Sequence, residues 1–290
     1  MPTAAELLPT VLGDYWFHSR GFIPSAALVR LLGELGVGPD ATRAALSRLS
    51  RDGRLERARL GRHTSYRLAD ALVGHAEAQG RRLMRFGADP VAWDGTWTCV
   101  AFSIPEADAR RRARLRRRLR ALGLGALFDG LWITPHAPVD ALDRCLADLG
   151  VAGAAVLRAT EVPRPAGVAL TSAWDLASLR AGYDDLAALV DGIAGRLAAG
   201  AVTPAEAFVA RSGLMRAWRA LAMADPLLPD ALQPAGWPRR AVREGFIATY
   251  DGLGPLAEER VRALAGEAGA DAVPRHHRVA DVAGDAGAGA

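Results

Sequence analysis

Cysteine is scarce in this sequence, which has only Cys99 and Cys145 among its 290 residues. The two lie far apart and neither belongs to a C-x-x-C pair, so the sequence supports neither a disulfide framework nor a zinc site. We expect both to be small core residues.

Long apolar runs are missing as well. No stretch approaches the roughly 20 consecutive apolar residues of a membrane-spanning helix, and the N-terminus lacks the basic and apolar segments of a signal peptide. Half of the residues are nevertheless hydrophobic and 23% are charged, which is enough apolar surface for real cores and argues against global disorder. We therefore expect a globular cytoplasmic protein with no membrane partner.

The common signatures of enzymes are also absent. The sequence has no Walker loop, no G-x-S-x-G and no H-E-x-x-H motif. Its six histidines are dispersed apart from His276-His277. We therefore predict a protein that is not an enzyme, with no catalytic residues, no bound metal and no cofactor.

Lysine is absent too, so all 36 basic residues are arginines, and the net charge is +4. Residues 43–67 hold eight arginines against Asp52 and Glu56, whereas residues 151–290 hold 14 arginines against 16 acids. Such a local positive patch attracts polyanions and releases counterions when it binds DNA. An arginine-rich composition alone explains part of this excess.

The first 87 residues have a helical pattern with one pair of strands. We expect three helices, a tight turn at Gly61-Arg62-His63 between two short strands, and a linker helix over 69–86. The expected helices are 7–17, 25–35 and 41–51, and the expected strands are 55–60 and 64–68. Helix, turn, helix and basic hairpin in this order predict a winged helix-turn-helix DNA-binding domain over residues 1–87.

The helix over 41–51 is the candidate recognition helix. Its packing side is expected to hold Ala41, Ala45, Leu46 and Leu49. Its outer face is expected to hold Arg43, Ser47, Ser50 and Arg51, with Arg48 on the flank. Arginine bonds guanine bidentately and serine bonds bases or phosphates, as a helix in the major groove requires. At the hairpin, the predicted contacts to the DNA backbone or minor groove are Arg59, Arg62 and His63. A solvated amphipathic helix is the alternative, and the basic hairpin favours DNA binding.

A second domain is predicted over residues 88–170, after the boundary at Asp89-Pro90. Strands alternate with helices there in a β-α-β-α-β order, which predicts a compact ferredoxin-like α+β domain. The expected strands are 97–104, 128–134 and 151–159, and the expected helices are 105–122 and 139–149.

The first helix of this domain contains eight arginines and no acid between residues 110 and 120. A charge run of this kind is usually a solvated face. Binding of phosphates, from DNA or from a ligand, is the other interpretation. The sequence does not separate the two.

The chain is expected to be helical from Thr171. We assign residues 171–266 to a helical C-terminal domain for effector binding or dimerisation. Beyond Gly266 the hydrophobic periodicity disappears and small residues accumulate, so we expect a disordered tail over 267–290.

Arg211 falls on the apolar stripe of a C-terminal helix and therefore needs an anionic partner. The other members of the stripe are Phe208, Met215, Trp218 and Ala222. One partner would be an internal carboxylate, from Asp175, Asp184 or Asp185. The other would be the phosphate or carboxylate of an effector, with the pocket aromatics Trp174, Tyr183 and Trp218.

Three groups of motifs resemble the PaaX family, the repressors of phenylacetate catabolism. The first is T-R-A-A-L-S-R-L-S-R-D-G at 42–53 with G-R-H-T-S-Y at 61–66. The second comprises W-D-G-T-W at 93–97, S-I-P-E at 103–106 and G-L-W-I-T-P at 130–135. The third, and the most specific, is D-P-L-L-P-D-A-L-Q-P-A-G-W-P at 225–238. In this chain Arg239-Arg240 then follows where the family often has glycine.

This resemblance implies a winged-helix domain, a central domain similar to the small CRISPR adaptation nuclease subunit, and a helical C-terminal domain. It also implies a homodimer that binds double-stranded operator DNA and is released by phenylacetyl-coenzyme A or a related aryl acyl-CoA effector. We therefore expect a transcriptional repressor of an aromatic, phenylacetate-type catabolic operon.

Two other functions remain open at this point. One is a metal-dependent nuclease that works through the ferredoxin-like domain, but residues 98–104 contain no carboxylate for a metal, and Glu106 and Asp108 suit the start of a helix. The other is a winged-helix protein whose partner is another protein.

Overall fold

The computed structural model describes residues 3–17, 19–61, 63–162, 167–267, 270 and 272–284. The chain divides into two compact units. The first contains Met1–Phe86, Asp185–Ala220 and Ala241–Ala290, and the second contains Gly87–Asp184 and Leu221–Arg240. The helices predicted over 171–266 therefore contribute to both units.

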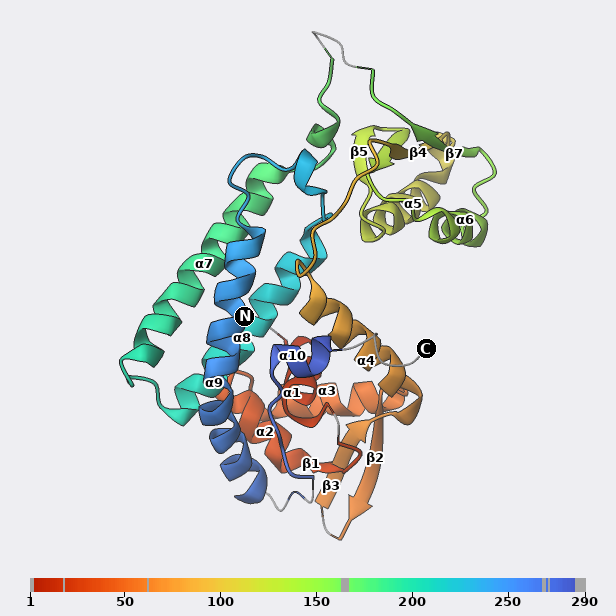
Figure 1. Ribbon diagram of the computed structural model, residues 1–290. Coiled ribbons are helices and arrows are strands. Elements are labelled where there is room, and N and C mark those ends of the chain that lie inside the picture. The colour runs from red at the N-terminus through yellow and green to blue at the C-terminus, as the bar shows by residue number, and fades with distance from the viewer. Residues whose placement is uncertain are drawn as a thin grey trace, which may run out of the picture. The chain divides into compact units, whose positions relative to one another are not determined.

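The first unit begins with helices and a small sheet (Figure 1). In chain order the elements are α1 (Ala4–Trp16), β1 (Ile23–Pro24), α2 (Ser25–Glu34), α3 (Pro39–Arg51), β2 (Leu55–Leu60), β3 (His63–Leu68) and α4 (Asp70–Arg85). The sheet has the order β1-β3-β2 and is antiparallel, with Leu55 opposite Leu68 in the hairpin. The three predicted helices and the hairpin are confirmed, and β1 was not predicted.

Glycines and a proline set the bounds of α3. Gly36 has φ +82° beyond the end of α2, Pro39 is the first residue of α3, and Gly53 has φ +68° after its end. Positive φ favours glycine, and proline suits the first helical turn. The predicted packing side was wrong at its first residue, because Ala41 is exposed while Thr42 is buried and donates its hydroxyl to the Gly38 carbonyl at 3.1 Å.

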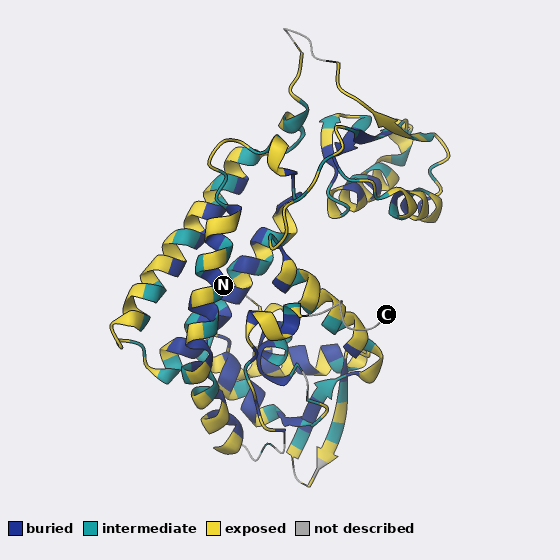
Figure 2. Ribbon diagram, in the orientation of Figure 1, coloured by how far each residue is buried: buried dark blue, intermediate teal, exposed yellow. Residues whose placement is uncertain are grey.

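Parts of three long helices complete the first unit, together with a short one: α7 (Leu176–Ala198), α8 (Pro204–Ala224), α9 (Arg239–Glu267) and α10 (Val279–Ala283). An aromatic stack holds α8 and α9 together: the ring of Phe246 lies 4.5 Å from Trp218 and 5.3 Å from Tyr250. Trp218 also donates its indole N–H to the Leu83 carbonyl of α4 at 3.0 Å. The stack therefore joins the N-terminal elements to the C-terminal helices. Figure 2 shows runs of buried residues along α8 and α9.

Residues 272–284 correct the prediction of a disordered tail from 267 onward. Val279 and Val282 of α10 are buried, and so is Ala272. The Ala272 carbonyl accepts the indole N–H of Trp16 at 3.0 Å, and the Tyr15 carbonyl accepts the backbone N–H of Arg275 at 2.8 Å. This part of the chain is therefore packed on the first unit despite its small-residue composition.

The second unit contains a four-stranded antiparallel sheet of order β5-β6-β4-β7. In chain order its elements are β4 (Trp97–Phe102), η1 (Glu106–Asp108), α5 (Ala109–Ala121), β5 (Gly125–Phe128), β6 (Leu131–Thr134), α6 (Val139–Asp148), β7 (Ala154–Ala159), η2 (Leu170–Ala173) and η3 (Asp230–Leu232). This β-α-β-β-α-β arrangement is ferredoxin-like, as predicted. The prediction was wrong in one respect, since the strand expected over 128–134 is a hairpin of β5 and β6.

The core of this domain lies between the sheet and the helices α5 and α6. It consists of Val100, Leu115, Leu119, Leu124, Trp132, Leu142, Cys145 and Leu149. Cys145 is thus a core residue as predicted, whereas Cys99 is half-buried. Among the residues that the structure describes, no helix is both long enough and apolar enough to cross a membrane.

Candidate functional site

The outer face of α3 carries exposed arginine and serine side chains. Ser47 and Arg51, one helical turn apart, are both exposed and lie opposite the buried Leu46 and Leu49. Arg43 is exposed but its guanidinium bonds Asp40 at 3.0 Å. Such an exposed ion pair contributes little to stability, so Arg43 is free to exchange Asp40 for another anion.

The other predicted residues of α3 differ in exposure. Arg48 is exposed on the flank and Ser50 is half-buried. Ser50 therefore has the shortest reach of the predicted set. Arg48 has no ion pair among the described residues, so its guanidinium is available to an anion beside the helix.

The hairpin that follows α3 continues this basic surface. Arg57 and Arg59 on β2 are exposed, and His63 at the start of β3 is exposed as well. Neither arginine has an ion pair within the described part of the chain. Arg62 lies outside the described residues.

Arg67, the last arginine of the basic segment, has a structural role instead. Its guanidinium bonds Glu56 at 2.6 Å and Asp70 at 2.9 Å. Hydrogen bonds from the backbone of Asp70 and from Arg67 hold the pKa of Glu56 below its usual range. These contacts join β2, β3 and the start of α4.

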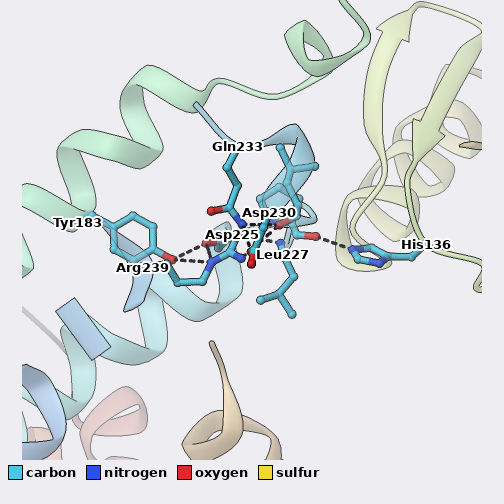
Figure 3. A network of polar contacts seen from close by, with 9 residues as sticks. His136, Tyr183, Asp225, Leu227, Asp230, Gln233 and Arg239 are labelled. Carbon is cyan, nitrogen blue, oxygen red and sulfur yellow. Dashed lines mark hydrogen bonds and ion pairs between the residues drawn. The ribbon is translucent and has the colours of Figure 1, made fainter. Parts of the chain in front are cut away.

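The second unit contains a buried polar cluster, which we call the Asp225 cluster: Tyr183, Asp225 and Arg239 (Figure 3). Two nitrogens of Arg239 bond the Asp225 carboxylate at 2.8 and 3.0 Å. The hydroxyl of Tyr183 donates to the same carboxylate. Burial first, and then the neighbouring Asp225, raise the pKa of Tyr183 well above its ordinary value.

The Asp225 cluster also fixes the backbone of the motif at 225–238. The Asp225 carboxylate accepts the Leu227 N–H at 2.6 Å, and Leu227 adopts φ +56°, which is uncommon for a residue other than glycine. The Leu228 carbonyl accepts hydrogen bonds from Gln233 at 2.7 Å and from Arg239 at 3.2 Å. The ring of His136 contacts the Pro226 carbonyl at 3.0 Å, from Nε2. The motif is therefore a folded loop held by one buried ion pair.

Three family profiles match the chain. "PaaX-like protein" matches residues 3–72, "PaaX protein central Cas2-like domain" matches 90–169, and "PaaX-like protein C-terminal domain" matches 174–263. The chain belongs to the PaaX family. The Transcriptional repressor PaaX of Escherichia coli (strain K12) is 29% identical over 268 residues, which are 88% of this chain and 82% of the relative.

A solved structure of similar fold extends the comparison. The Uncharacterized protein Rv0674 from Mycobacterium tuberculosis has a TM-score of 0.56 and 26% sequence identity, and the match covers 90% of this chain and 98% of that one. The resemblance read from the sequence motifs is thus confirmed, and the PaaX-family organisation extends over nearly the whole chain.

The ion pair of Arg239 with Asp225 is the contact that the sequence interpretation missed. Arg239 follows the W-P pair of the motif and begins α9. Both it and Asp225 are buried, at 6% and 7% exposure. The signal in the sequence was an arginine directly after an apolar, proline-rich loop that starts with an aspartate.

Arg211, one of the four predicted effector residues, is fully buried at 0% exposure. Its guanidinium donates to the carbonyls of Tyr250 at 3.2 Å and His277 at 2.7 Å, and lies 3.9 Å from the centre of the Tyr250 ring. Asp14 lies nearby and accepts the Tyr250 hydroxyl at 2.9 Å. Burial raises the pKa of Asp14, and the positive charge of Arg211 opposes that shift.

None of the three carboxylates expected to pair with Arg211 does so. Asp175 bonds the backbone and hydroxyl of Ser178 at the start of α7, and Asp184 forms an ion pair with Arg180 at 3.0 Å. Asp185 is exposed and has no ion pair among the described residues. The carboxylate whose negative charge acts on Arg211 and raises its pKa is Asp14, which comes from the other end of the sequence.

The four predicted effector residues are divided between the two units. Arg211 and Trp218 belong to the first unit, whereas Trp174 and Tyr183 belong to the second. Trp174 is half-buried and its ring stacks 6.2 Å from that of Trp97. The other three side chains are buried in the cores described above.

A shallow hollow lies beside the Asp225 cluster, and Leu176, Leu179 and Trp237 contribute to its wall. It has no interior space for a water molecule, whereas pockets for drug-sized ligands hold about 300–1,000 Å³, so this hollow is not an effector pocket. The described residues contain no group of three or more His, Cys, Asp or Glu that could hold a metal ion.

Proposed function

We propose that this chain is a DNA-binding transcriptional repressor and that α1 to β3 form a winged helix-turn-helix. The observation that carries the proposal is the outer face of α3, where Ser47 and Arg51 are exposed beside the basic hairpin. Three helices followed by a basic hairpin have the element order of this motif, with α3 as the recognition helix. Membership of the PaaX family and the name of the Escherichia coli relative support it.

Each predicted residue has a role in this proposal. Arg51 and Arg43 bond guanine edges in the major groove, and Ser47 bonds a base or a phosphate. Ser50 is half-buried and so contacts only the groove wall, while Arg48 contacts a phosphate. The hairpin residues Arg59, Arg62 and His63 contact the backbone or the adjacent minor groove.

Replacing Arg51 with alanine is expected to weaken operator binding by about 1–3 kcal/mol and to relax the preference at one base position. The operator would first be selected from random duplexes, and the affinities measured by fluorescence anisotropy at fixed salt. The matched control is Arg216→Ala, which removes an exposed arginine of α8 and should leave affinity within a factor of two. Equal operator affinities of the Arg51 variant and the wild type would contradict the proposal that the outer face of α3 contacts bases. If the wild-type protein prefers no duplex over any other, the proposal of sequence-specific DNA binding is wrong.

We also propose that the repressor is a homodimer that regulates a phenylacetate-type catabolic operon and is released by an aryl acyl-CoA thioester. The support is the family membership, to which the motif at 225–238 contributes the most specific resemblance, and the name of the Escherichia coli relative. Release requires two states of the protein, because a ligand shifts an equilibrium only by its different affinities for them.

Phenylacetyl-coenzyme A is therefore expected to weaken operator binding by about 5- to 150-fold, the usual range of coupling between two sites. The operator must weaken binding of the thioester by the same factor. Anisotropy with thioester and calorimetry with operator measure the two factors, and free coenzyme A and phenylacetate are the controls. If no aryl thioester changes operator affinity, this effector class is wrong while the proposal of DNA binding remains.

A further inference from the structure

Helix α5 of the ferredoxin-like domain carries eight arginines around a narrow apolar stripe. Leu115 and Leu119 are fully buried and face the core of the domain. The helix covers one face of the domain's sheet (Figure 1). Its arginines fall into two groups. In one group each guanidinium contacts a carboxylate, a carbonyl or an aromatic ring among the described residues of the same domain, and in the other group it does not.

Five of the arginines have partners along the two flanks of the helix. Arg111 pairs with Asp108 at 3.4 Å, Arg116 with Asp129 at 3.4 Å, and Arg118 with Asp148 at 2.8 Å. Arg112 donates to the Ile104 carbonyl at 3.0 Å, and the guanidinium of Arg120 lies 5.2 Å from the centre of the Trp132 ring. The flanks are therefore occupied by contacts within the domain.

The other three arginines, Arg110, Arg114 and Arg117, form what we call the arginine ridge. All are exposed, and within the described part of the chain no carboxylate or carbonyl contacts their guanidinium groups. Residues at spacings of four and three lie on one side of a helix, here opposite the buried Leu115. At 1.5 Å per residue the ridge extends about 10 Å.

We infer that the arginine ridge is a second DNA contact, which binds phosphates of the backbone without reading sequence. This inference rests on the proposed function, because it requires a protein that binds DNA. A convex ridge of about 10 Å cannot surround the phosphate of a small ligand, but it matches a line of phosphates along about three base pairs of a duplex. Like charges one turn apart repel each other by about 0.2–0.5 kcal/mol per pair, and a polyanion relieves that repulsion.

The variant Arg110→Ala, Arg114→Ala, Arg117→Ala tests the inference in the full chain. Alanine keeps the helix, since it has the highest helix propensity. Three lost phosphate contacts should make the slope of log K against log salt shallower by about 2.7 for each bound chain, at about 0.9 per contact. The ratio of wild-type to variant affinity should then change by about 40-fold between 50 and 200 mM salt. The preference for operator over random duplex should stay the same.

The matched control is Arg111→Ala, Arg116→Ala, Arg118→Ala, which removes the same charge from the same helix but takes arginines from its flanks, where they point to carboxylates of the domain and away from the ridge. Its slope should change by less than about one unit. If the slope changes equally in both variants, the effect comes from net charge, and the inference that the arginine ridge contacts DNA is wrong. The inference is also wrong if the ridge variant has the wild-type slope. The single variant Arg114→Gln, expected to change the slope by about 0.9, serves if the triple variant unfolds.

Failure of the ridge and failure of the proposed function give different results. If wild-type protein binds operator and Arg51→Ala loses operator preference while the ridge variant keeps the wild-type slope, only the ridge is wrong. If the wild type binds no duplex, both are wrong.

Discussion

Replacing Arg239 with methionine is expected to lower the free energy of unfolding by about 3–5 kcal/mol, because it leaves a buried carboxylate without its counter-charge. The side chain of Asp225 is 0% exposed and that of Arg239 is 8% exposed. The carboxylate keeps only the Tyr183 hydroxyl and the Leu227 N–H as donors. These neutral donors do not replace a guanidinium that contributes two charged hydrogen bonds.

A double-mutant cycle with Asp225→Asn separates the ion pair from packing. Asparagine keeps the shape and one acceptor for the Leu227 N–H but removes the charge. The double variant should therefore lose less stability than the two single variants together, with an interaction energy of about 1–3 kcal/mol. The measurement is urea unfolding followed by tryptophan fluorescence, since Trp237 packs 5.7 Å from the Tyr183 ring.

The control for this cycle is an exposed pair in the same unit. Arg180 and Asp184 are 43% and 59% exposed, so Asp184→Ala should cost at most about 1 kcal/mol. Asp184 is the member to replace, because Arg180 also donates to the Gly236 carbonyl of the loop. If Arg239→Met costs no more than Asp184→Ala, the buried pair does not hold the loop at 225–238. A strictly additive cycle would likewise contradict a direct interaction between Asp225 and Arg239.

Most helices and strands of the N-terminal region and of the ferredoxin-like domain could be predicted from the sequence. The helices before Arg51, the hairpin after it and the alternating order of the ferredoxin-like domain all follow from hydrophobic periodicity and turn residues. The hairpin of β5 and β6 was also open to prediction, because Asp129-Gly130 is a strong hairpin signal. It was missed because the apolar residues on both sides were taken as one strand.

Partners far apart in the sequence could not be predicted in this way. Periodicity placed Arg211 correctly on an apolar face, but the groups around it come from α1, α9 and the segment before α10. A search among nearby carboxylates therefore chose the wrong acids. The partner of Arg239 was missed for a related reason, since Asp225 lies 14 residues away at the other end of the loop at 225–238.

The sequence predicted which face of α3 is exposed, but it did not predict the burial and contacts of each side chain on that face. A turn of 100° per residue placed Ser47 and Arg51 outward, and both are exposed. It could not show that Ser50 is half-buried or that Arg43 bonds Asp40. Those details depend on the neighbouring elements and on side-chain rotamers, which the helical period does not contain.

Ending the chain at Glu267 should destabilise the first unit by about 3–6 kcal/mol, because Val279 and Val282 lose their buried positions and full burial of each such side chain contributes about 1.5–3 kcal/mol. Polar contacts are lost as well: the indole N–H of Trp16 loses the Ala272 carbonyl, and Arg211 loses that of His277. The loss for Arg211 is the more serious, since a fully buried guanidinium then keeps one carbonyl and the rings of Tyr15 and Tyr250.

A chain ending at Gly284 is the matched control for this truncation, because it keeps α10 and every contact just described. Its urea midpoint should equal that of the full chain, whereas the chain ending at Glu267 should unfold at a clearly lower urea concentration. The double variant Val279→Ala, Val282→Ala keeps the chain length and should lose part of the same stability, since only the apolar contacts change. If the full chain, the two truncated chains and the double valine variant all have the same urea midpoint, residues 272–284 do not pack on the rest of the first unit. A lower midpoint for the truncation alone would instead assign the stability to the backbone carbonyls that bond Trp16 and Arg211.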